Sequence, residues 1–187
     1  MANACKEANT AQHLSDVMAG TESGNRMNLE TFVQRSYMEK ILCDANRRFR
    51  DMSNGQFELK LINVEDAGEG KNKGLDLEVL SIVTDKTRSV NTLSGGESFM
   101  AALSLALGMA DQIQAATAAI HLDVMFIDEG FGSLSDNARN EAVNILKEMA
   151  GKQRQIGIIS HVSELKDEIE NQLIVKKDDR GSHISWR

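Results

Sequence analysis

Two short apolar segments on either side of an amphipathic helix constrain the fold of this chain more than any other feature. Residues 124–127 and 156–159 are continuous apolar runs of strand length, which is typical of strands buried on both faces. The alternation of strand, helix and strand predicts parallel pairing and an α/β fold. The helix between the two runs is predicted from apolar residues at helical spacing, namely Ala138, Ala142, Ile145, Leu146 and Met149.

The preceding part of the chain favours one helix followed by antiparallel strands. Residues 28–52 are predicted to form a helix, which should end at Ser-Asn-Gly in positions 53–55. Apolar and polar residues then alternate over 57–61 and 75–79, which is the pattern of half-buried strands in a hairpin or meander. The apolar stripe of the predicted helix consists of Leu29, Val33, Tyr37, Ile41, Ala45 and Phe49.

The remaining segments complete the outline. Residues 97–119 are rich in alanine and leucine and predict a long helix. A short helix and two strands, at 172–176 and 183–186, are expected to close the chain. Residues 1–27 are polar and indicate an end or a linker rather than part of the core.

Composition excludes some classes of function. The net charge is −7, so the chain does not coat DNA through an overall positive charge. Short basic clusters at 47–50, 71–73 and 176–177 are interpreted as solvated surface. No apolar run approaches the roughly 20 residues that a membrane span needs, so no membrane contact is expected. The two cysteines, Cys5 and Cys43, argue against a disulfide framework and favour a reducing cytoplasm.

Residues 93–97, Leu-Ser-Gly-Gly-Glu, lie immediately before the long helix. Glycines let a backbone approach a ligand closely, and the first turn of a helix offers free N–H groups at its positive dipole end. Ser94 adds a hydroxyl group. This combination is typical of a phosphate-binding tip, although an ordinary N-cap with glycines in the turn explains these five residues equally well.

Polar residues also follow both apolar runs. Asp128 at the end of a strand can hold Mg²⁺ near nucleotide phosphates, and the adjacent Glu129 can polarise an attacking water. His161 follows the second run, where it can donate a hydrogen bond to a phosphate. Taken singly, the carboxylates are more often the start of a solvated loop, and the histidine is more often structural.

The order and spacing of these three elements are far more specific than any one of them. The Asp-Glu pair begins 31 residues after Glu97, and His161 lies 32 residues after Glu129. This arrangement resembles the C-terminal part of ABC-type ATPases. By that resemblance, residues 93–97 are the signature motif, Asp128 and Glu129 are Walker B with its catalytic glutamate, and His161 is the switch histidine.

A Walker A motif is missing from the chain. It requires glycine, four residues, and then Gly-Lys-Ser/Thr, so that backbone N–H groups and a lysine surround the phosphates. The only Gly-Lys pairs, at 70–71 and 151–152, are followed by Asn72 and Gln153. SMC-like and SbcC-like proteins carry Walker A far away, beyond an antiparallel coiled coil, and the chain resembles their second half.

Within that class the sequence is most similar to SbcC-type exonuclease subunits, through residues 45–48, 52–57, 92–108 and 127–134. The resemblance implies that 28–187 is the C-terminal lobe of a split ATPase head, with 1–27 as the base of a coiled coil or a linker. The implied fold is α/β, with buried, largely parallel strands flanked by helices, plus an N-terminal helix and antiparallel strands.

The resemblance also implies roles for individual residues. Asp128 would support Mg²⁺ with ATP, while Glu129 and His161 would be catalytic. The D-loop, which usually carries aspartate, has Ser135 followed by Asp136. Arg88 either couples ATP engagement to movement of the lobes or is a plain surface arginine. The residues that would bind ATP held by the opposite head are Ser94, Gly95, Gly96 and Glu97.

The implied partners are the N-terminal Walker A half of the same polypeptide, a second SbcC-like head, an SbcD-like nuclease and double-stranded DNA ends. The cofactors are ATP and Mg²⁺, and the isolated chain is expected to be inactive because it lacks the phosphate cradle. Two alternatives remain open. One is an SMC- or RecN-like head that clamps DNA without a nuclease, and the other is a module that ATP joins without hydrolysis.

Overall fold

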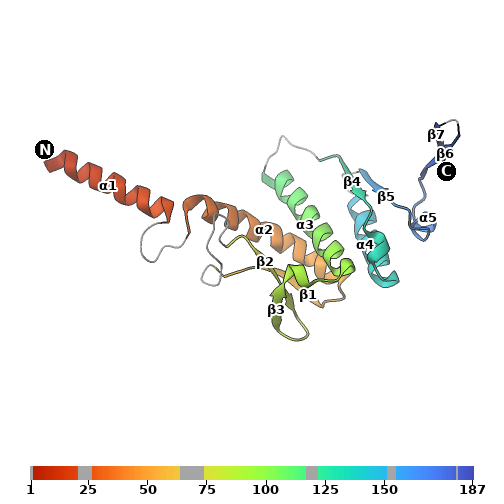
Figure 1. Ribbon diagram of the computed structural model, residues 1–187, viewed down its shortest axis with the longest axis horizontal. Coiled ribbons are helices and arrows are strands. Elements are labelled where there is room, and N and C mark those ends of the chain that lie inside the picture. The colour runs from red at the N-terminus through yellow and green to blue at the C-terminus, as the bar shows by residue number, and fades with distance from the viewer. Residues whose placement is uncertain (1, 21–26, 64–73, 117–121, 151–154, 180) are drawn as a thin grey trace.

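The structure is a computed structural model that describes residues 2–20, 27–63, 74–116, 122–150, 155–179 and 181–187. The described helices lie largely in one row, with strands on either side of the central helix pair (Figure 1). The helices are α1 (Ala2–Ala19), α2 (Leu29–Met52), α3 (Gly95–Ala116), α4 (Asp136–Ala150) and α5 (Leu165–Glu168), with short 3-10 turns η1 (Val90–Thr92) and η2 (Phe131–Ser133).

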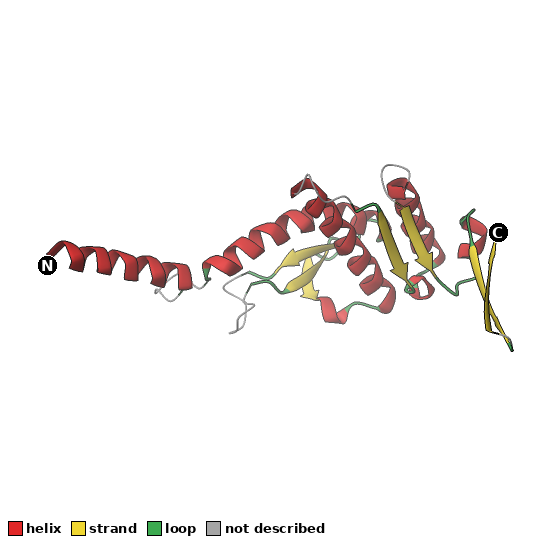
Figure 2. Cartoon of the chain, turned by 90° about the horizontal axis from the view of Figure 1, so that it is seen from above, coloured by secondary structure: helices red, strands yellow, loops and turns green. Residues whose placement is uncertain are grey.

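The described strands form three separate sheets (Figure 2). The first is an antiparallel meander in the order β1-β2-β3, the second is the parallel pair β4–β5, and the third is the antiparallel hairpin β6–β7. The strands are β1 (Phe57–Leu61), β2 (Leu77–Ser81), β3 (Lys86–Ser89), β4 (Val124–Asp128), β5 (Gln155–Ile159), β6 (Leu173–Asp178) and β7 (Gly181–Trp186).

Helix α2 begins and ends where its sequence signals predict. The Asn28 side chain accepts a hydrogen bond from the Thr31 N–H at 2.7 Å, which satisfies one of the free donors of the first turn. Asn54 and Gly55 have φ angles of 52° and 73°, so the chain leaves the helix through the left-handed region. The Gly55 N–H closes the end by donating to the Arg50 carbonyl at 2.7 Å.

Only the C-terminal half of the predicted α2 stripe is core. Ala45 and Phe49 are fully buried, whereas Leu29, Val33 and Tyr37 are exposed, Tyr37 by 55%. The predicted helix is present, but its apolar stripe is buried over only part of its length. The reason is geometric, since α2 is longer than the elements that pack on it, and its first turns extend past α3 and the meander (Figure 1).

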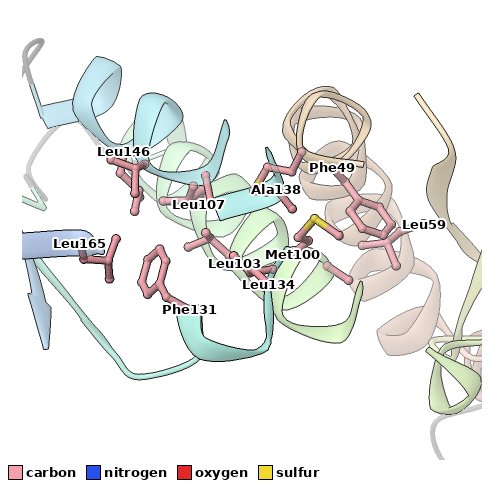
Figure 3. Close-up of a cluster of buried hydrophobic side chains, with 14 of the residues drawn as sticks. Phe49, Leu59, Met100, Leu103, Leu107, Phe131, Leu134, Ala138, Leu146 and Leu165 are labelled. Carbon is pink, nitrogen blue, oxygen red and sulfur yellow. The ribbon is translucent and has the colours of Figure 1, made fainter. Parts of the chain in front are cut away.

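The packing of α3 on α2 forms the centre of the core. Gly108 allows the close approach, because a Cβ there would lie 2.7 Å from the Ile41 carbonyl oxygen. Arg48 and Asp111 form an ion pair at 2.5 Å beside this contact, and Gln112 donates to Asp44 at 2.6 Å. The buried side chains that continue the core toward η2, α4 and α5 are shown in Figure 3 and include Leu103, Leu107, Phe131, Leu134, Leu146 and Leu165.

Helix α3 is long and apolar enough to cross a membrane, by length and composition alone. The expectation that no segment comes close to the length of a membrane span is therefore wrong. The apolar character of α3 has a different use in this structure. The residues that face α2 and η2 are buried, among them Met100, Leu103 and Leu107. A core helix meets the same criteria of length and composition, so the observation is weak evidence for a membrane.

The meander contains one strand that the sequence analysis missed. β1 matches the expected range, β2 begins at Leu77 rather than 75, and β3 pairs with β2 although its sequence, Lys-Thr-Arg-Ser, has no apolar residue. Leu59 and Val79 are paired in register and buried. The Asn46 side chain of α2 exchanges two hydrogen bonds with the Leu59 backbone, which fixes the meander on that helix.

The parallel pairing of β4 and β5 confirms the α/β class, with Phe126 opposite Gly157 in the register. The expectation that both strands are buried on both faces is wrong. Along β4 burial alternates, and Phe126 is 71% exposed because α4 covers only one face of the pair (Figure 2). Among the described strand pairs this is the one parallel pair, so the expectation of largely parallel strands holds only here.

The two ends of the chain complete the fold. The predicted closing strands are present as the hairpin β6–β7, whose Trp186 is 77% exposed. Within residues 1–27, which were expected to be an end, a linker or the base of a coiled coil, the structure contains helix α1, and α1 extends away from the other elements (Figure 1). The basic cluster at 71–73, most of the loop after β1 and residues 117–119 of the predicted long helix lie outside the described residues.

Candidate functional site

The signature tip, residues 93–97, forms the start of α3, which begins at Gly95 rather than at the expected position 97, and it is closed by a reciprocal pair of hydrogen bonds. The Ser94 N–H donates to Glu97 Oε2 at 2.8 Å, and the Glu97 N–H donates to Ser94 Oγ at 3.3 Å. This is a capping box, in which each residue satisfies a free donor of the other. Within the described part of the chain, the N–H groups of Gly95 and Gly96 have no such partner and remain available to a ligand.

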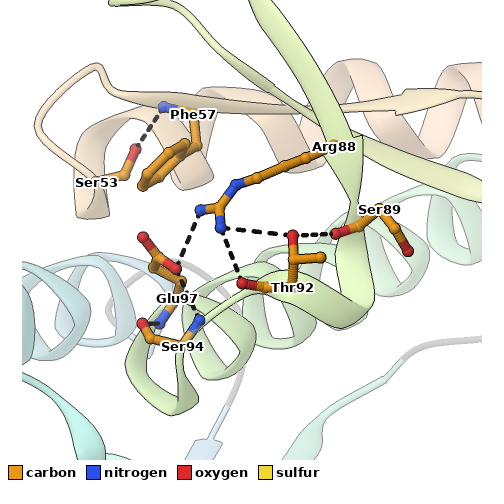
Figure 4. A network of polar contacts seen from close by, with 7 residues as sticks. All are labelled: Ser53, Phe57, Arg88, Ser89, Thr92, Ser94 and Glu97. Atoms are coloured by element: carbon orange, nitrogen blue, oxygen red, sulfur yellow. Dashed lines mark hydrogen bonds and ion pairs between the residues drawn. The ribbon is translucent and has the colours of Figure 1, made fainter.

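Arg88 of β3 connects this tip to the meander (Figure 4). Its guanidinium donates to the Thr92 carbonyl at 2.8 Å and forms an ion pair with Glu97 at 3.2 Å. The same group lies 5.4 Å from the centre of the Phe57 ring. Arg88 is thus not a plain surface arginine, because it contacts β1, η1 and the first turn of α3 together.

These contacts keep Glu97 ionised. Burial alone would raise the pKa of Glu97, but hydrogen bonds from the backbone and hydroxyl of Ser94 and from Arg88 favour the charged form, as does the positive charge of Arg88. The pKa of Glu97 therefore lies below its ordinary value. A negative charge at the start of a helix also interacts favourably with the helix dipole.

The tip packs closely against the turn η2, which follows β4. A Cβ on Gly96 would lie 2.7 Å from the Ser133 carbonyl oxygen, so only glycine fits there without a shift of backbone. At Gly95 the nearest atom to such a Cβ would be Ser133 Cβ at 3.6 Å, an ordinary contact. The two glycines therefore differ, since Gly96 is required by packing and Gly95 is not.

Glu129 occupies an unusual backbone conformation at the end of β4. Its φ is 62°, and its N–H donates to the Ile159 carbonyl of β5 at 2.9 Å. Gly130 follows with a φ of 96°, and a Cβ there would lie 2.1 Å from the Phe99 ring of α3. The turn that carries Glu129 is consequently held by the neighbouring strand on one side and by α3 on the other.

The structure brings Glu129 and His161 together, as expected for residues at the same edge of two parallel strands. His161 Nδ1 lies 2.7 Å from Glu129 Oε2, with the histidine side chain 79% exposed and the carboxylate 52% exposed. Asp128 is the last residue of β4 and is exposed beside them. The pair is accessible to a ligand, and either ring nitrogen of His161 can carry the proton.

The residues assigned to the D-loop cap helix α4. The Ser135 hydroxyl accepts from the Ala138 N–H at 3.4 Å, and Asp136 forms an ion pair with Arg139 at 2.6 Å. Serine and aspartate are both favoured N-cap residues, so Ser135 keeps the local structure that the family's usual aspartate would give. Asp136 is almost fully exposed and therefore free to contact another molecule with its second oxygen.

Sequence analysis missed two structural supports of this site. One is the Arg88 network, although the Ser-x-x-Glu pattern at 94–97 is itself a readable capping signal. The other is the contact between Phe99 and the turn at Gly130, which is continued by an edge-to-face pair of Phe99 and Phe131 at 5.0 Å. No sequence signal pairs these residues, because they lie about 30 positions apart on different elements.

The described residues contain no cluster of three or more metal-binding side chains. Asp128 is a suitable hard oxygen ligand at the end of a strand, but one carboxylate does not hold Mg²⁺ without ligands from elsewhere. The residues present therefore fit separate parts of nucleotide–Mg²⁺ sites: open amides at the tip in one place, and in another a carboxylate suited to a metal beside the Glu129–His161 pair.

Comparison with known proteins identifies the family. The family described as "SbcC/RAD50-like, Walker B motif" matches residues 75–148. The C subunit of the nuclease SbcCD from Treponema pallidum is 41% identical over 171 residues, and that from Vibrio cholerae is 45% identical over 172. Each match covers 91% of this chain, which spans 16% and 17% of the length of those two relatives.

Solved structures support the fold. A chain from work on ATP-driven dimerization and DNA stimulated activation of SMC ATPases has a TM-score of 0.64 and 18% identity, with 84% of this chain and 89% of that chain covered. An Smc head bound to the C-winged helix domain of ScpA has a TM-score of 0.64 and 19% identity, with 84% and 45% covered. These matches concern the fold alone, whereas the family match and the sequence relatives show that the chain belongs to the SbcC/RAD50-like family, as a C-terminal, Walker B-containing segment of an SbcC-type protein.

Proposed function

We propose that this chain is the C-terminal half of an ATPase head that takes part in two nucleotide sites at once. It would supply Walker B to ATP held by the N-terminal half of its own polypeptide, and the signature tip to ATP held by a second head. The observation that carries the proposal is the pair of half-sites in one chain: the capped tip with open Gly95 and Gly96 amides, and the Glu129–His161 pair at 2.7 Å.

At the first half-site, each side chain would have a separate task. Asp128 would hold Mg²⁺, usually through water, together with oxygens of the nucleotide. Glu129 would accept a proton from the attacking water, and the positive φ of its backbone turns it out of the strand toward solvent. His161, in contact with that carboxylate, would orient it and sense the γ-phosphate.

At the second half-site, backbone groups would do most of the binding. The amides of Gly95 and Gly96 and the Ser94 hydroxyl lie at the start of a 22-residue helix, where the dipole favours an anion. Head-to-head closure would exclude water from the phosphate, and hydrogen bonds to a charged group gain strength in such a place. Asp136 would take over the D-loop contacts between the two heads.

Exposed apolar surface supports the view that the head is incomplete without its N-terminal half. Phe126 and Val124 project from the uncovered face of β4, and Ile159 is exposed on β5. The hairpin β6–β7 carries a second uncovered apolar face, because Leu173 pairs with Trp186 and Val175 pairs with Ile184. Surfaces of this kind are typical of interfaces, and the greater part of the relatives' length lies outside this chain.

The first turns of α2, which follow residues 1–27 directly, support the proposal that a coiled coil begins in this part of the chain. Leu29, Phe32, Val33 and Tyr37 are exposed at helical spacing, which gives the first turns of α2 an apolar stripe that is open to solvent. We assign residues 28–187 to the lobe and the segment before them to the coiled-coil base or a linker. A cytoplasmic location remains part of the proposal.

The nuclease partner and DNA ends belong to the whole protein and are proposed from the name of the relatives, which are components of the nuclease SbcCD. Binding of DNA would need a surface other than the cluster at 47–50. Arg47, Arg48 and Arg50 are each paired with a carboxylate, those of Asp44, Asp111 and Glu58 respectively. The contact of His161 with Glu129 favours hydrolysis over a module that ATP merely joins.

The signature tip gives the direct test. When the chain is joined to its N-terminal half, the head should form a dimer in ATP, and Ser94→Arg should prevent it because a guanidinium would occupy the place of the phosphate. Light scattering with and without ATP measures this. Thr84→Arg adds the same charge at the exposed β2–β3 turn and should dimerise like the parent. A dimer of normal stability in the Ser94 variant would refute the assignment of the tip.

A further inference from the structure

The signature tip carries a charge that works against its proposed ligand. Glu97 is ionised, and its Oε2 accepts from the N–H of Ser94, the residue whose hydroxyl would meet the phosphate. At the effective dielectric of a protein surface, two like charges a few ångströms apart repel enough to weaken binding by about tenfold or more. A tip with an unopposed Glu97 would therefore be a poor place for a phosphate.

The counter-charge in the structure is Arg88. Its guanidinium lies 3.2 Å from Glu97 Oε2, on a side chain that is only 36% exposed. Its other contacts, with the Thr92 carbonyl at 2.8 Å and with the Phe57 ring, restrict it to this position. In the close-up of the network, Arg88 reaches Glu97 from the strand side while Ser94 contacts Glu97 from the turn (Figure 4).

We propose that Arg88 is a positioning residue for the signature tip: it neutralises Glu97 and holds it in the capping box, so that the tip can accept the phosphate of ATP on a second head. The inference rests on the proposed function of the tip. It assigns to the meander a task in nucleotide binding, because β1 and β3 hold the guanidinium that makes the tip attractive to an anion.

A purely structural role for Arg88 makes a different prediction. If Arg88 only held η1 and Phe57 in place, the defect caused by replacing Arg88 would be the same with and without the charge of Glu97. If it offsets that charge, removal of the charge should restore what removal of Arg88 destroys. Glutamine at position 97 is suited to the comparison, because its amide oxygen can still accept from the Ser94 N–H in a capping box.

The experiment is a double-mutant cycle in the full-length SbcC-type polypeptide, read by the ATP concentration at which half of the heads dimerise. Arg88→Gln should raise that concentration about tenfold, and Arg88→Lys, which keeps the charge, by no more than about threefold. Glu97→Gln alone should lower it about threefold because Arg88 is then unopposed. The double variant should return to within about threefold of the parent.

Two further measurements complete the test. The affinity of single heads for ATP under conditions that prevent dimerisation should be the same in all variants, since that site lies on the other half. The defect of Arg88→Gln should shrink at high salt, which screens the uncovered charge. A double variant as defective as Arg88→Gln would overturn the proposal, and a parent that never dimerises in ATP would overturn the function on which it rests.

Discussion

Asp128 and Glu129 are adjacent carboxylates that the structure places in different settings. Asp128 ends a regular strand, whereas Glu129 has left-handed backbone geometry and contacts His161. A left-handed conformation is costly for a residue other than glycine, and it persists here because the Ile159 carbonyl and the packing at Gly130 hold the turn. The difference in setting suggests that replacement of the two carboxylates has different consequences.

In a reconstituted head, Glu129→Gln should leave ATP binding intact and lower hydrolysis by orders of magnitude, because it keeps size and hydrogen bonding but loses the base. The closed dimer should then accumulate. Asp128→Asn should also weaken Mg²⁺-dependent binding, because a hard cation prefers anionic oxygen. ATP affinity, turnover and dimer lifetime distinguish the two. If the Glu129 variant hydrolysed ATP at the parent rate, the catalytic role of Glu129 would be wrong. The alternative, in which ATP only joins two heads, would then be favoured.

At this scale, sequence information was sufficient to locate the residues to which we assign chemical roles, but not the residues that hold them in place. The positions of Ser94, Glu129 and His161 follow from spacing and from the ends of predicted elements. Phe99 and Arg88 are different, because their partners are fixed by how α3 and β3 pack on distant segments. Short-range patterns do not contain that information.

At the scale of elements, the link between the start of α3 and the turn η2 is the central feature. The proposed function assigns the signature tip and the segment after Glu129 to different half-sites. The two segments nevertheless touch, because Gly96 lies against the Ser133 backbone and Gly130 lies against the Phe99 ring. The local signals for helix ends were reliable, as the caps at Asn28 and at Ser53–Gly55 show. β3 was missed because it has no apolar residue. It is a strand because its backbone pairs with β2, which its own sequence does not indicate.

The two glycines of the tip should respond differently to alanine. Gly96→Ala should destabilise the chain by about 1–3 kcal/mol, because its Cβ would meet the backbone oxygen of Ser133. Gly95→Ala has room and should be neutral, or stabilising by up to about 1 kcal/mol, because alanine favours the helix. Urea unfolding followed by circular dichroism compares them. Equal free energies of unfolding for both variants would contradict the close contact of the tip with η2.

At the scale of the whole molecule, the chain has the core of a lobe and the surface of an interface. Buried side chains gather where α2, α3 and α4 meet, while one face of β4–β5 and one face of β6–β7 are apolar and exposed. Composition alone did not predict this exposure, because a run such as Val-Met-Phe-Ile is equally apolar whether its cover comes from this chain or from another. The exposed apolar faces therefore support the proposal that another part of the protein covers these strands.

Complementation between two disabled heads tests most directly whether the chain completes a nucleotide site on another head. One full-length variant carries Ser94→Arg, and the other lacks the Walker A lysine of the N-terminal half, so that each homodimer should be inactive. A mixed dimer retains one intact site, formed by Walker A of the first variant and the signature tip of the second. ATP turnover should therefore reappear on mixing, and it should be lost again when Glu129→Gln is added to the head with intact Walker A. A mixture as inactive as its components would contradict the account.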